Sequence, residues 1–304
     1  MIHTCTLNPS IDYVMHLEGF ETGQLNRATK TFYYPGGKGI NVSRMLSRFD
    51  TATTALGFAG GFTGQFIKSF LEEEGIHEKF IDTGDYTRIN VKLKADEESE
   101  INGPGPQITR EQQEQLLQQI KELHSDDKLV LAGSVPASLS NDIYIKIAEI
   151  CKEMSVPLIA DTSGAALEQL IGYPAFLLKP NHHELGQLFQ TSIETKKQAA
   201  SYAKKLIERG AKHVIVSMGG EGAVFVSDKY SYYATVPKGE VKNSVGAGDS
   251  LVSGFLAAYT KGSSLEEAFR FGVASGSATA FSDDLCKQDD VEALLSEVHI
   301  SPII

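Results

Sequence analysis

Short apolar segments that end in polar or glycine residues recur along this chain, and this pattern indicates its fold class. They are KLVLAG (128–133), PLIAD (157–161), AFLLKPN (175–181) and HVIVSMGG (213–220). Segments of helical periodicity, such as TREQQEQLLQQIKEL (109–123), separate them. Strands that alternate with helices predict an α/β fold with a mostly parallel, doubly wound sheet flanked by helices. Ligands bind such sheets at the carboxyl ends of the strands, so the residues that follow each strand are the first candidates for a site.

Three further segments predict a small β-sheet that stands apart from this core. YVMHLEGF (13–20) and NRATKTFYY (26–34) are rich in β-forming residues and are joined by glycine and polar residues, which predicts a hairpin. TRINVKLKA (87–95) alternates apolar with polar residues, as in a sheet with one solvated face. We therefore expect a single domain over residues 1–304, with the small sheet formed by segments about 12–35 and 86–105.

The composition excludes several classes of protein. A chain of 304 residues suffices for one large α/β domain, and its net charge of −11 argues against nucleic acid as a partner, because binding to a phosphate backbone requires a basic face. Cys5, Cys151 and Cys286 are isolated, so neither a disulfide framework nor a zinc site is indicated. The first residues lack a basic segment followed by an apolar run, and no stretch is long enough to span a bilayer. We expect a cytoplasmic protein without a membrane partner.

One glycine turn carries an acidic residue where a helix begins, in VKNSVGAGDSLVSGF (241–255). Gly246 and Gly248 allow a ligand to approach the backbone, and the free N–H groups at a helix start attract anions. A negative charge on Asp249 is unexpected in such a place. Taken alone, Asp249 is most simply a helix cap.

A second glycine-rich turn, SMGGEG, follows the strand that ends near Ser217. A turn of this kind can cradle the phosphates of a nucleotide, with Gly219, Gly220 and Gly222 allowing close approach. Hairpins use glycine in the same way, and no G-x-x-x-x-G-K-[ST] pattern is present to decide between the two interpretations.

The segment LLKPNHHEL offers groups for phosphate and for a metal ion. Lys179 can meet a phosphate, and Asn181 with Glu184 suits Mg²⁺ held largely through water. The alternative is that Asn181 caps a helix and Glu184, three residues on, completes a capping box.

Near the start of the chain, YYPGGKGINVSR places a lysine among glycines before a helix. Gly37, Lys38 and Asn41 can hold an anionic ligand there, or the glycines can form a packing turn. Asp12 can accept hydrogen bonds from sugar hydroxyls or cap a turn, and Arg88 can clamp a phosphate or lie on a solvated face.

Together these segments resemble the PfkB family of ribokinase-like carbohydrate kinases, from TLNPSID (6–12) to NSVGAGDS (243–250). The two glycine motifs, GGKGINVSR and VGAGDSLVSGF, match the two signatures of that family in order. The resemblance implies a ribokinase-like fold with a β-sheet lid, and transfer of a phosphoryl group from MgATP to a hexose phosphate. TLNPSID, NGPGP (102–106) and NSVGAGDS are most similar to members that convert fructose-1-phosphate to fructose-1,6-bisphosphate, with tagatose-6-phosphate as the alternative substrate.

The resemblance also implies a role for each candidate residue. The catalytic group comprises the base Asp249 and an anion hole formed by Gly246, Ala247 and Gly248. The sugar phosphate falls to Asp12, Gly37, Lys38, Asn41 and Arg88, with Lys30 or Arg27 as further cations for its existing phosphate. ATP falls to Lys179, Asn181, Ser217, Gly219, Gly220, Gly222, Gly246 and Gly248, and magnesium to Glu184, through water, and Asn181.

Further expectations concern assembly, ions and the strength of the base. In this family lids can pair, so a homodimer through the lid is expected. Asn243 and Ser244 stand where many sugar kinases carry Asp or Thr, which leaves activation by a monovalent cation open. The helix dipole should keep Asp249 ionised and weakly basic. A non-catalytic sugar-phosphate sensor is the rival function, whereas a nicotinamide dehydrogenase lacks its G-x-G-x-x-G turn after the first strand.

Overall fold

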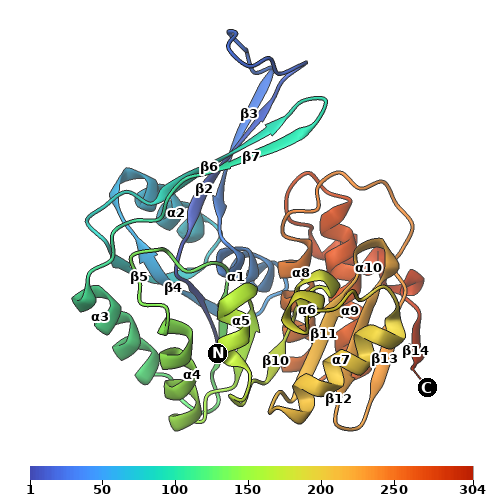
Figure 1. Ribbon diagram of the computed structural model, residues 1–304. Helices are drawn as coiled ribbons and strands as arrows, with labels where there is room; N and C mark the ends of the chain where they lie inside the picture. Colours follow the sequence, from blue (N-terminus) through green and yellow to red (C-terminus); the bar gives the residue numbers. More distant parts are fainter. Residues whose placement is uncertain (304) are drawn as a thin grey trace.

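The computed structural model describes residues 1–303 and contains one large β-sheet between two layers of helices (Figure 1). Seven neighbouring strands, from β11 to β5, are parallel, and β12, β13 and β14 continue the sheet in antiparallel fashion. In spatial order the strands are β14 (Ile300–Pro302), β13 (Ser231–Ala234), β12 (Ala223–Ser227), β11 (His213–Ser217), β10 (Leu177–Leu178), β9 (Leu158–Asp161), β8 (Lys128–Ala132), β1 (Ile2–Thr6), β4 (Thr53–Ala59) and β5 (His77–Asp82). The mostly parallel, doubly wound sheet expected from the sequence is therefore confirmed.

Each face of this sheet packs on its own set of helices, because its central strands are apolar on both faces. One core lies under α3 (Arg110–Lys121), α4 (Ile143–Glu153), α5 (Gly164–Leu170), α6 (His182–Leu188) and α7 (Lys196–Glu208). The other lies under α1 (Lys38–Arg48), α2 (Gly61–Glu73), α8 (Ala247–Thr260), α9 (Leu265–Ala280) and α10 (Gln288–Leu294). Two short 3₁₀ helices, η1 (Gly219–Glu221) and η2 (Leu295–Glu297), complete the helices of residues 1–303. Within that part of the chain, no helix combines the length and apolar character needed to cross a membrane.

The strand order reverses between β1 and β8. From β1 the chain proceeds to β4 and β5 on one side, then returns to β8 on the other side and continues outward to β11. Such a reversal opens a crevice at the carboxyl ends of the two central strands, because their connections leave in opposite directions. The loops after β1 and β8, with the glycine turns before α1 and α8, meet there.

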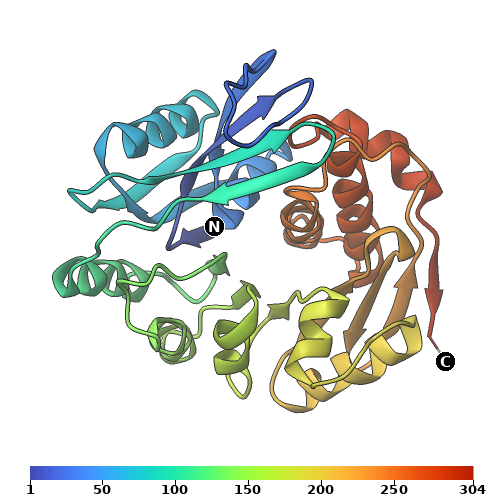
Figure 2. The same ribbon diagram turned by 45° about the horizontal axis from the view of Figure 1, so that its top comes forward.

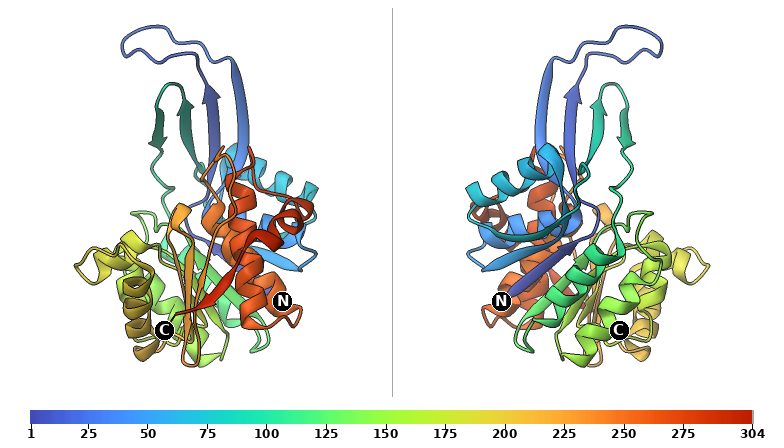
Figure 3. Two further views of the ribbon diagram at one scale, coloured as in Figure 1. Left: turned by 90° about the vertical axis from the view of Figure 1, so that its right-hand side faces the viewer. Right: turned by 90° about the vertical axis from the view of Figure 1, so that its left-hand side faces the viewer.

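A separate four-stranded sheet stands beside this crevice, as expected. Its order is β3 (Lys30–Gly36), β2 (Ser10–His16), β6 (Arg88–Lys94) and β7 (Glu98–Asn102). β2 and β3 form the expected hairpin, although the strands are shorter than the β-rich segments because residues 17–29 form the loop that connects them. Figure 2 shows this hairpin (blue) beside β6 and β7 (teal), and Figure 3 shows the sheet projecting from the body.

The strand alternation divides the small sheet into two faces. Ser10, Asp12 and Asn90 line the crevice, whereas Tyr13 and Ile89 belong to the opposite set of alternating positions. The apolar and polar alternation of the sequence therefore decides which side chains can reach a ligand.

Candidate active site

A cleft of about 880 Å³ occupies the crevice at the carboxyl ends of the central strands. It lies between the inner face of the small sheet and the helix starts of α1, α6 and α8, so residues far apart in the chain share it. The sequence-predicted residues that line it are Asp12, Gly37, Lys38, Asn41, Arg88, Lys179, Asn181, Glu184, Ser217, Gly246, Gly248 and Asp249.

Asp249 lies on the first turn of α8 and is almost fully buried, with 4% of its surface exposed. Asn41 Nδ2, on α1, donates a hydrogen bond to Asp249 Oδ2 at 2.8 Å. Gly246 occupies the N-cap position, and no side-chain hydrogen bond caps this helix. The helix-cap interpretation of Asp249 is therefore wrong, since its carboxylate is held by another helix and faces the cleft.

Burial and, second to it, the nearby Asp161 carboxylate raise the pKa of Asp249 to about 6, against the opposing effects of Lys38, Asn41 and Lys179. The expectation of a weakly basic carboxylate was wrong. The helix dipole lowers the pKa of a carboxylate at a helix start, but desolvation and the second anion have the larger effect on the pKa of Asp249. A carboxyl group with this pKa is still mostly ionised at neutral pH, and it is a stronger proton acceptor than an ordinary aspartate.

The second anion, Asp161, was missed in the sequence. It ends β9, is fully buried, and pairs with Lys38 Nζ at 2.9 Å and Lys179 Nζ at 3.3 Å. Burial acts to raise the pKa of Asp161, but Lys179 and Lys38 together hold it below its ordinary value. The available signal was a lone carboxylate at the end of the apolar strand PLIAD, at the edge of the sheet where ligands bind.

The glycine turn before α8 presents backbone amides to the same part of the cleft. Gly246 has a left-handed φ of 80°, and a Cβ placed on it would lie 2.6 Å from Leu285 Cδ2. The position of a Cβ on Gly248 lies 3.2 Å from Lys179 Nζ, so the turn and the ammonium group are adjacent. The first amides of a helix have no intrahelical acceptor, so Gly248 N–H is suited to an anion beside Lys179, whereas Ala247 N–H already donates to the Ser244 backbone oxygen at 3.3 Å.

The first glycine motif forms a close packing turn, and its role in holding an anionic ligand stays a prediction. Gly37 has φ 121°, and a Cβ on it would lie 2.8 Å from Thr6 Cγ2, while a Cβ on Gly39 would overlap the Thr6 hydroxyl. The packing-turn interpretation is thus confirmed, because the start of α1 lies directly on β1. This close packing also brings Lys38 to Asp161 and Asn41 to Asp249.

Polar groups without hydrogen-bond partners gather beneath the small sheet. Asp12 accepts hydrogen bonds from Ser10 Oγ at 2.8 Å and Asn90 Nδ2 at 3.1 Å. Arg88 Nη2 donates to the Asn8 backbone oxygen at 3.1 Å, and its Nε has no partner. The side-chain oxygens of Asn8 and Asn90, which sequence reasoning missed, also lack partners. Unpaired buried polar atoms are costly, so this end of the cleft is suited to a polar, anionic ligand.

The residues expected to bind a nucleotide and a metal ion lie only partly in the cleft. Asn181 and Glu184 form the capping box of α6, with reciprocal hydrogen bonds of 2.8 Å, so that interpretation is confirmed and their metal role stays a prediction. Gly219, Gly220, Gly222 and Ala247 are not among the lining residues. A Cβ on Gly222 would overlap the Ala234 backbone oxygen, which explains that glycine by hairpin packing.

Two cations named from the sequence lie away from this cleft. Lys30 lines a neighbouring hollow of about 490 Å³ that shares Asp12 and Asn41 with the cleft, and Arg27 lines neither. Among residues 1–303, no group of three or more His, Cys, Asp or Glu side chains is arranged to hold a metal ion. All three cysteines are buried and unpaired, as expected.

Comparison with known proteins places these features in a family context. The sequence model of the family described as pfkB family carbohydrate kinase matches residues 6–288 of this chain. The chain is 54% identical to 1-phosphofructokinase of Bacillus subtilis, over 99% of both chains, and 34% identical to D-tagatose-1-phosphate kinase of Bacillus licheniformis, also over 99% of both. The structure of phosphofructokinase-2 from Escherichia coli in its tetrameric inhibited form matches with a TM-score of 0.91 at 30% identity, covering 97% of this chain and 98% of that one. The same E. coli protein has a solved structure in complex with potassium.

Proposed function

Because the chain belongs to the pfkB family of carbohydrate kinases, we propose that it transfers the γ-phosphoryl group of ATP to fructose-1-phosphate and forms fructose-1,6-bisphosphate. The observation that carries the reaction is the buried Asp249, whose pKa is raised to about 6 beside a glycine turn and Lys179. The choice of sugar is supported by 54% identity to the B. subtilis 1-phosphofructokinase.

In the proposed reaction, the 6-hydroxyl of the sugar lies against Asp249. Its oxygen forms the new bond to the γ-phosphorus, the bond to the leaving oxygen of ADP breaks, and the hydroxyl proton passes to the Asp249 carboxylate. Phosphoryl transfer requires alignment and stabilisation of charge more than covalent chemistry. The amides of the turn at Gly246 to Gly248 and the ammonium of Lys179 supply that charge stabilisation.

The existing phosphate of the sugar is assigned to the opposite end of the cleft. Arg88 has a free Nε there and, among residues 1–303, no carboxylate within ion-pair distance, so its charge is available for a phosphate. The unpaired side-chain oxygens of Asn8 and Asn90 can accept hydrogen bonds from sugar hydroxyls, and Asp12 can accept hydrogen bonds from further hydroxyls. The ion pair of Lys38 with Asp161 supports a different role for Lys38, beside the phosphoryl group in transfer.

The carboxylates of the site are suited to magnesium bound together with ATP. Asp161 Oδ2 is buried without a hydrogen-bond partner, and Glu184 uses one oxygen in its capping box, which leaves the other for a water ligand. Mg²⁺ in nucleotide sites keeps several waters and needs only one or two carboxylates besides the phosphates. Glu184, through water, and Asp161 would hold it, while the Asn181 oxygen already accepts from the α6 backbone. The ion would neutralise phosphate charge.

The small sheet is proposed as a lid over the sugar and as the contact in a homodimer. Its inner face lines the cleft, and its outer face exposes apolar side chains, among them Tyr33 at 53% and Ile101 at 61%. Tyr13 stacks on Tyr33 with ring centroids 4.5 Å apart. A projecting sheet with one apolar face is suited to pairing with a second copy.

A kinetic panel tests the proposed function. ADP release should be fastest, at saturating MgATP, with fructose-1-phosphate, and slower with tagatose-1-phosphate, tagatose-6-phosphate, fructose-6-phosphate and free fructose. The 34% identity to a D-tagatose-1-phosphate kinase makes tagatose-1-phosphate the closest competitor. Faster turnover of any other sugar would refute the substrate assignment, and binding of sugar phosphate without ADP release would favour the sensor.

A further inference from the structure

A buried cation, Arg44, lies on α1, lines the neighbouring hollow that shares Asp12 and Asn41 with the cleft, and takes no part in the reaction proposed above. It is 1% exposed and sits one helical turn beyond Asn41. Its Nε donates to Glu74 Oε2 at 2.9 Å, and its Nη2 donates to Asp284 Oδ2 at 2.8 Å, with Nη1 to Asp284 Oδ1 at 3.3 Å. The guanidinium therefore joins the end of α2 to the segment that follows α9.

The segment that Arg44 holds forms the back of the glycine turn. Leu285, next to Asp284, occupies the space that a Cβ on Gly246 would need. Asn243 Nδ2 donates to the Asp283 backbone oxygen at 3.3 Å, which ties the residues before the turn to the same segment.

A second arginine strengthens this attachment. Arg48, also on α1, donates to the backbone oxygens of Leu285 and, at 3.1 Å, of Cys286. Its Nη2 lies 3.3 Å from Asp284 Oδ2. The segment 283–286 is thus fastened to α1 by two guanidinium groups and packs on the glycine turn by its side chains.

This arrangement connects both the base and the glycine turn to a single helix, α1. α1 holds Asp249 through Asn41 and approaches the phosphoryl site through Lys38. Through Arg44 and Asp284 it also supports the turn whose amides meet the phosphoryl group. A planar guanidinium bound to a carboxylate through two nitrogens sets both distance and orientation, which an apolar contact of equal stability does not.

We infer that Arg44 and Asp284 are positioning residues, which hold the glycine turn at Gly246 to Gly248 in register with Asp249 and Lys38 for phosphoryl transfer. The inference rests on the proposed kinase function. Displacement of a reacting group by about 1 Å costs roughly a hundredfold in rate, so a small shift of the turn lowers turnover while the sugar and ATP contacts outside the turn persist.

Asp284→Asn is the test variant. The Asp284 side chain is 30% exposed, so the protein can fold with an amide group in place of the carboxylate. We expect kcat to fall roughly ten- to a hundredfold while KM for fructose-1-phosphate and for ATP changes less than about threefold. Arg44→Lys keeps the charge but not the two-nitrogen contact, and it should lower kcat in the same way.

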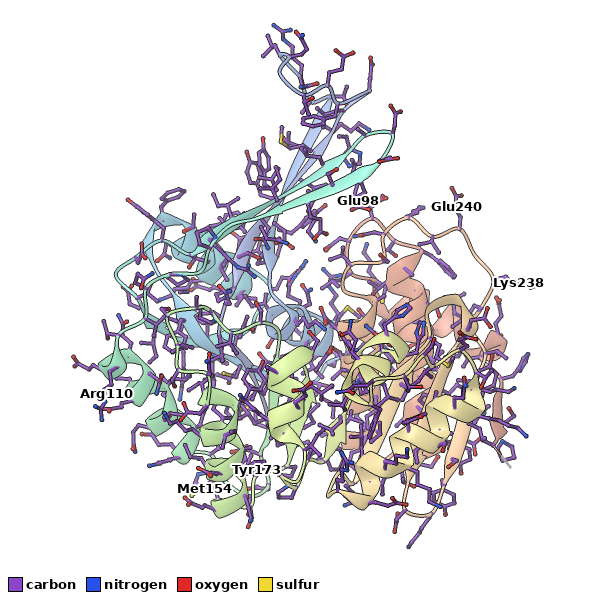
Figure 4. The ribbon with its side chains drawn as sticks, in the orientation of Figure 1. Glu98, Arg110, Met154, Tyr173, Lys238 and Glu240 are labelled. Atoms are coloured by element: carbon purple, nitrogen blue, oxygen red, sulfur yellow. The ribbon has the colours of Figure 1, made fainter. Side chains whose placement is uncertain are left out.

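Two controls separate positioning from stability. Glu114→Gln makes the same chemical change in an exposed ion pair with Arg110, which Figure 4 shows on α3 far from the lid, and it should leave kcat and the melting temperature unchanged. Leu206→Ala, in the other core, should lower the melting temperature without lowering kcat of the folded protein.

The wild-type protein in the same assay separates failure of the positioning role from failure of the proposed kinase function. If the wild type turns over sugar phosphate and Asp284→Asn keeps its kcat while losing stability, as Leu206→Ala does, then the positioning role is overturned. If the wild type itself releases no ADP with any sugar of the panel, the proposed function fails, and this inference fails with it.

Discussion

Replacing Asp161 with Asn should move the acidic limb of the kcat/KM profile to lower pH. After burial itself, the Asp161 carboxylate is the group that raises the pKa of Asp249. The substitution removes that anion and leaves Lys38 and Lys179 without the carboxylate that they share at 2.9 and 3.3 Å. Their charges then act on Asp249 uncompensated and lower its pKa further.

The size of the effect follows from the pKa of about 6 for Asp249. A base with that pKa is ionised to roughly 10% at pH 5, so the wild type should keep about a tenth of its plateau activity there. A variant whose pKa is lower by one unit, about 1.4 kcal/mol, would keep roughly half. The acidic limb should therefore shift by about one pH unit or more, even though the plateau falls because two lysines lose their anchor and the proposed magnesium site loses a carboxylate.

The assay is initial-rate ADP release at low fructose-1-phosphate between about pH 4.5 and 8.5. The second ionisation of a sugar phosphate also has a pKa near 6 and shapes the same limb. It is common to both proteins, so only the difference between the two profiles reports on Asp249. Glu114→Gln, far from the site, serves as the control and should give the wild-type profile.

An unchanged midpoint of the acidic limb in Asp161→Asn would contradict this prediction. It would mean that Asp249 is not the titrating base or that Asp161 does not act on it. A midpoint that moves upward would contradict the assigned sign of the Asp161 effect.

Four further outcomes are expected. Asp249→Asn should keep ATP and sugar binding, measured by calorimetry, and lose roughly 10²- to 10⁴-fold in kcat; because the buried carboxylate has a pKa raised to about 6, its folded form is penalised above that pH, so the variant should also unfold at higher temperature than the wild type at pH 8 but not at pH 4. Arg88→Met should raise KM for fructose-1-phosphate roughly tenfold or more and leave KM for ATP unchanged, and equal losses for both substrates would reject the phosphate assignment. Gly246→Ala should lower stability more than Gly262→Ala, since both glycines have positive φ but only Gly246 has Leu285 against its Cβ position; equal melting temperatures would contradict this. Ile101→Lys should dissociate the proposed dimer in light scattering, whereas Met154→Lys, on the body away from the lid (Figure 4), should not; loss of assembly in both would argue against the lid contact.

The small sheet and most of the cleft could be predicted from the sequence because both depend on local patterns. The alternation in TRINVKLKA predicts which face of β6 is polar, and this face carries Arg88 and Asn90, although the place of Asn90 in the cleft was not predicted. Lys179, Asn181 and Ser217 directly follow apolar strands, and the carboxyl ends of parallel strands meet at one edge. Glycine patterns were less decisive, because Gly222 serves hairpin packing and Gly37 serves a close approach to β1 as well as the cleft.

The mostly parallel sheet, the separate small sheet and the residue types of the candidate site could be predicted from the sequence, because they follow from periodicity and from where strands end. The electrostatics of the site required the three-dimensional structure. Asp161 meets Lys38 across 123 residues because β9 and the start of α1 converge on the same crevice, and Asp249 becomes a stronger base because burial and that second carboxylate outweigh the helix dipole. Desolvation and Coulomb interactions depend on distances between segments remote in sequence. The local pattern therefore predicts which charged residues form the site, and the fold sets their pKa values.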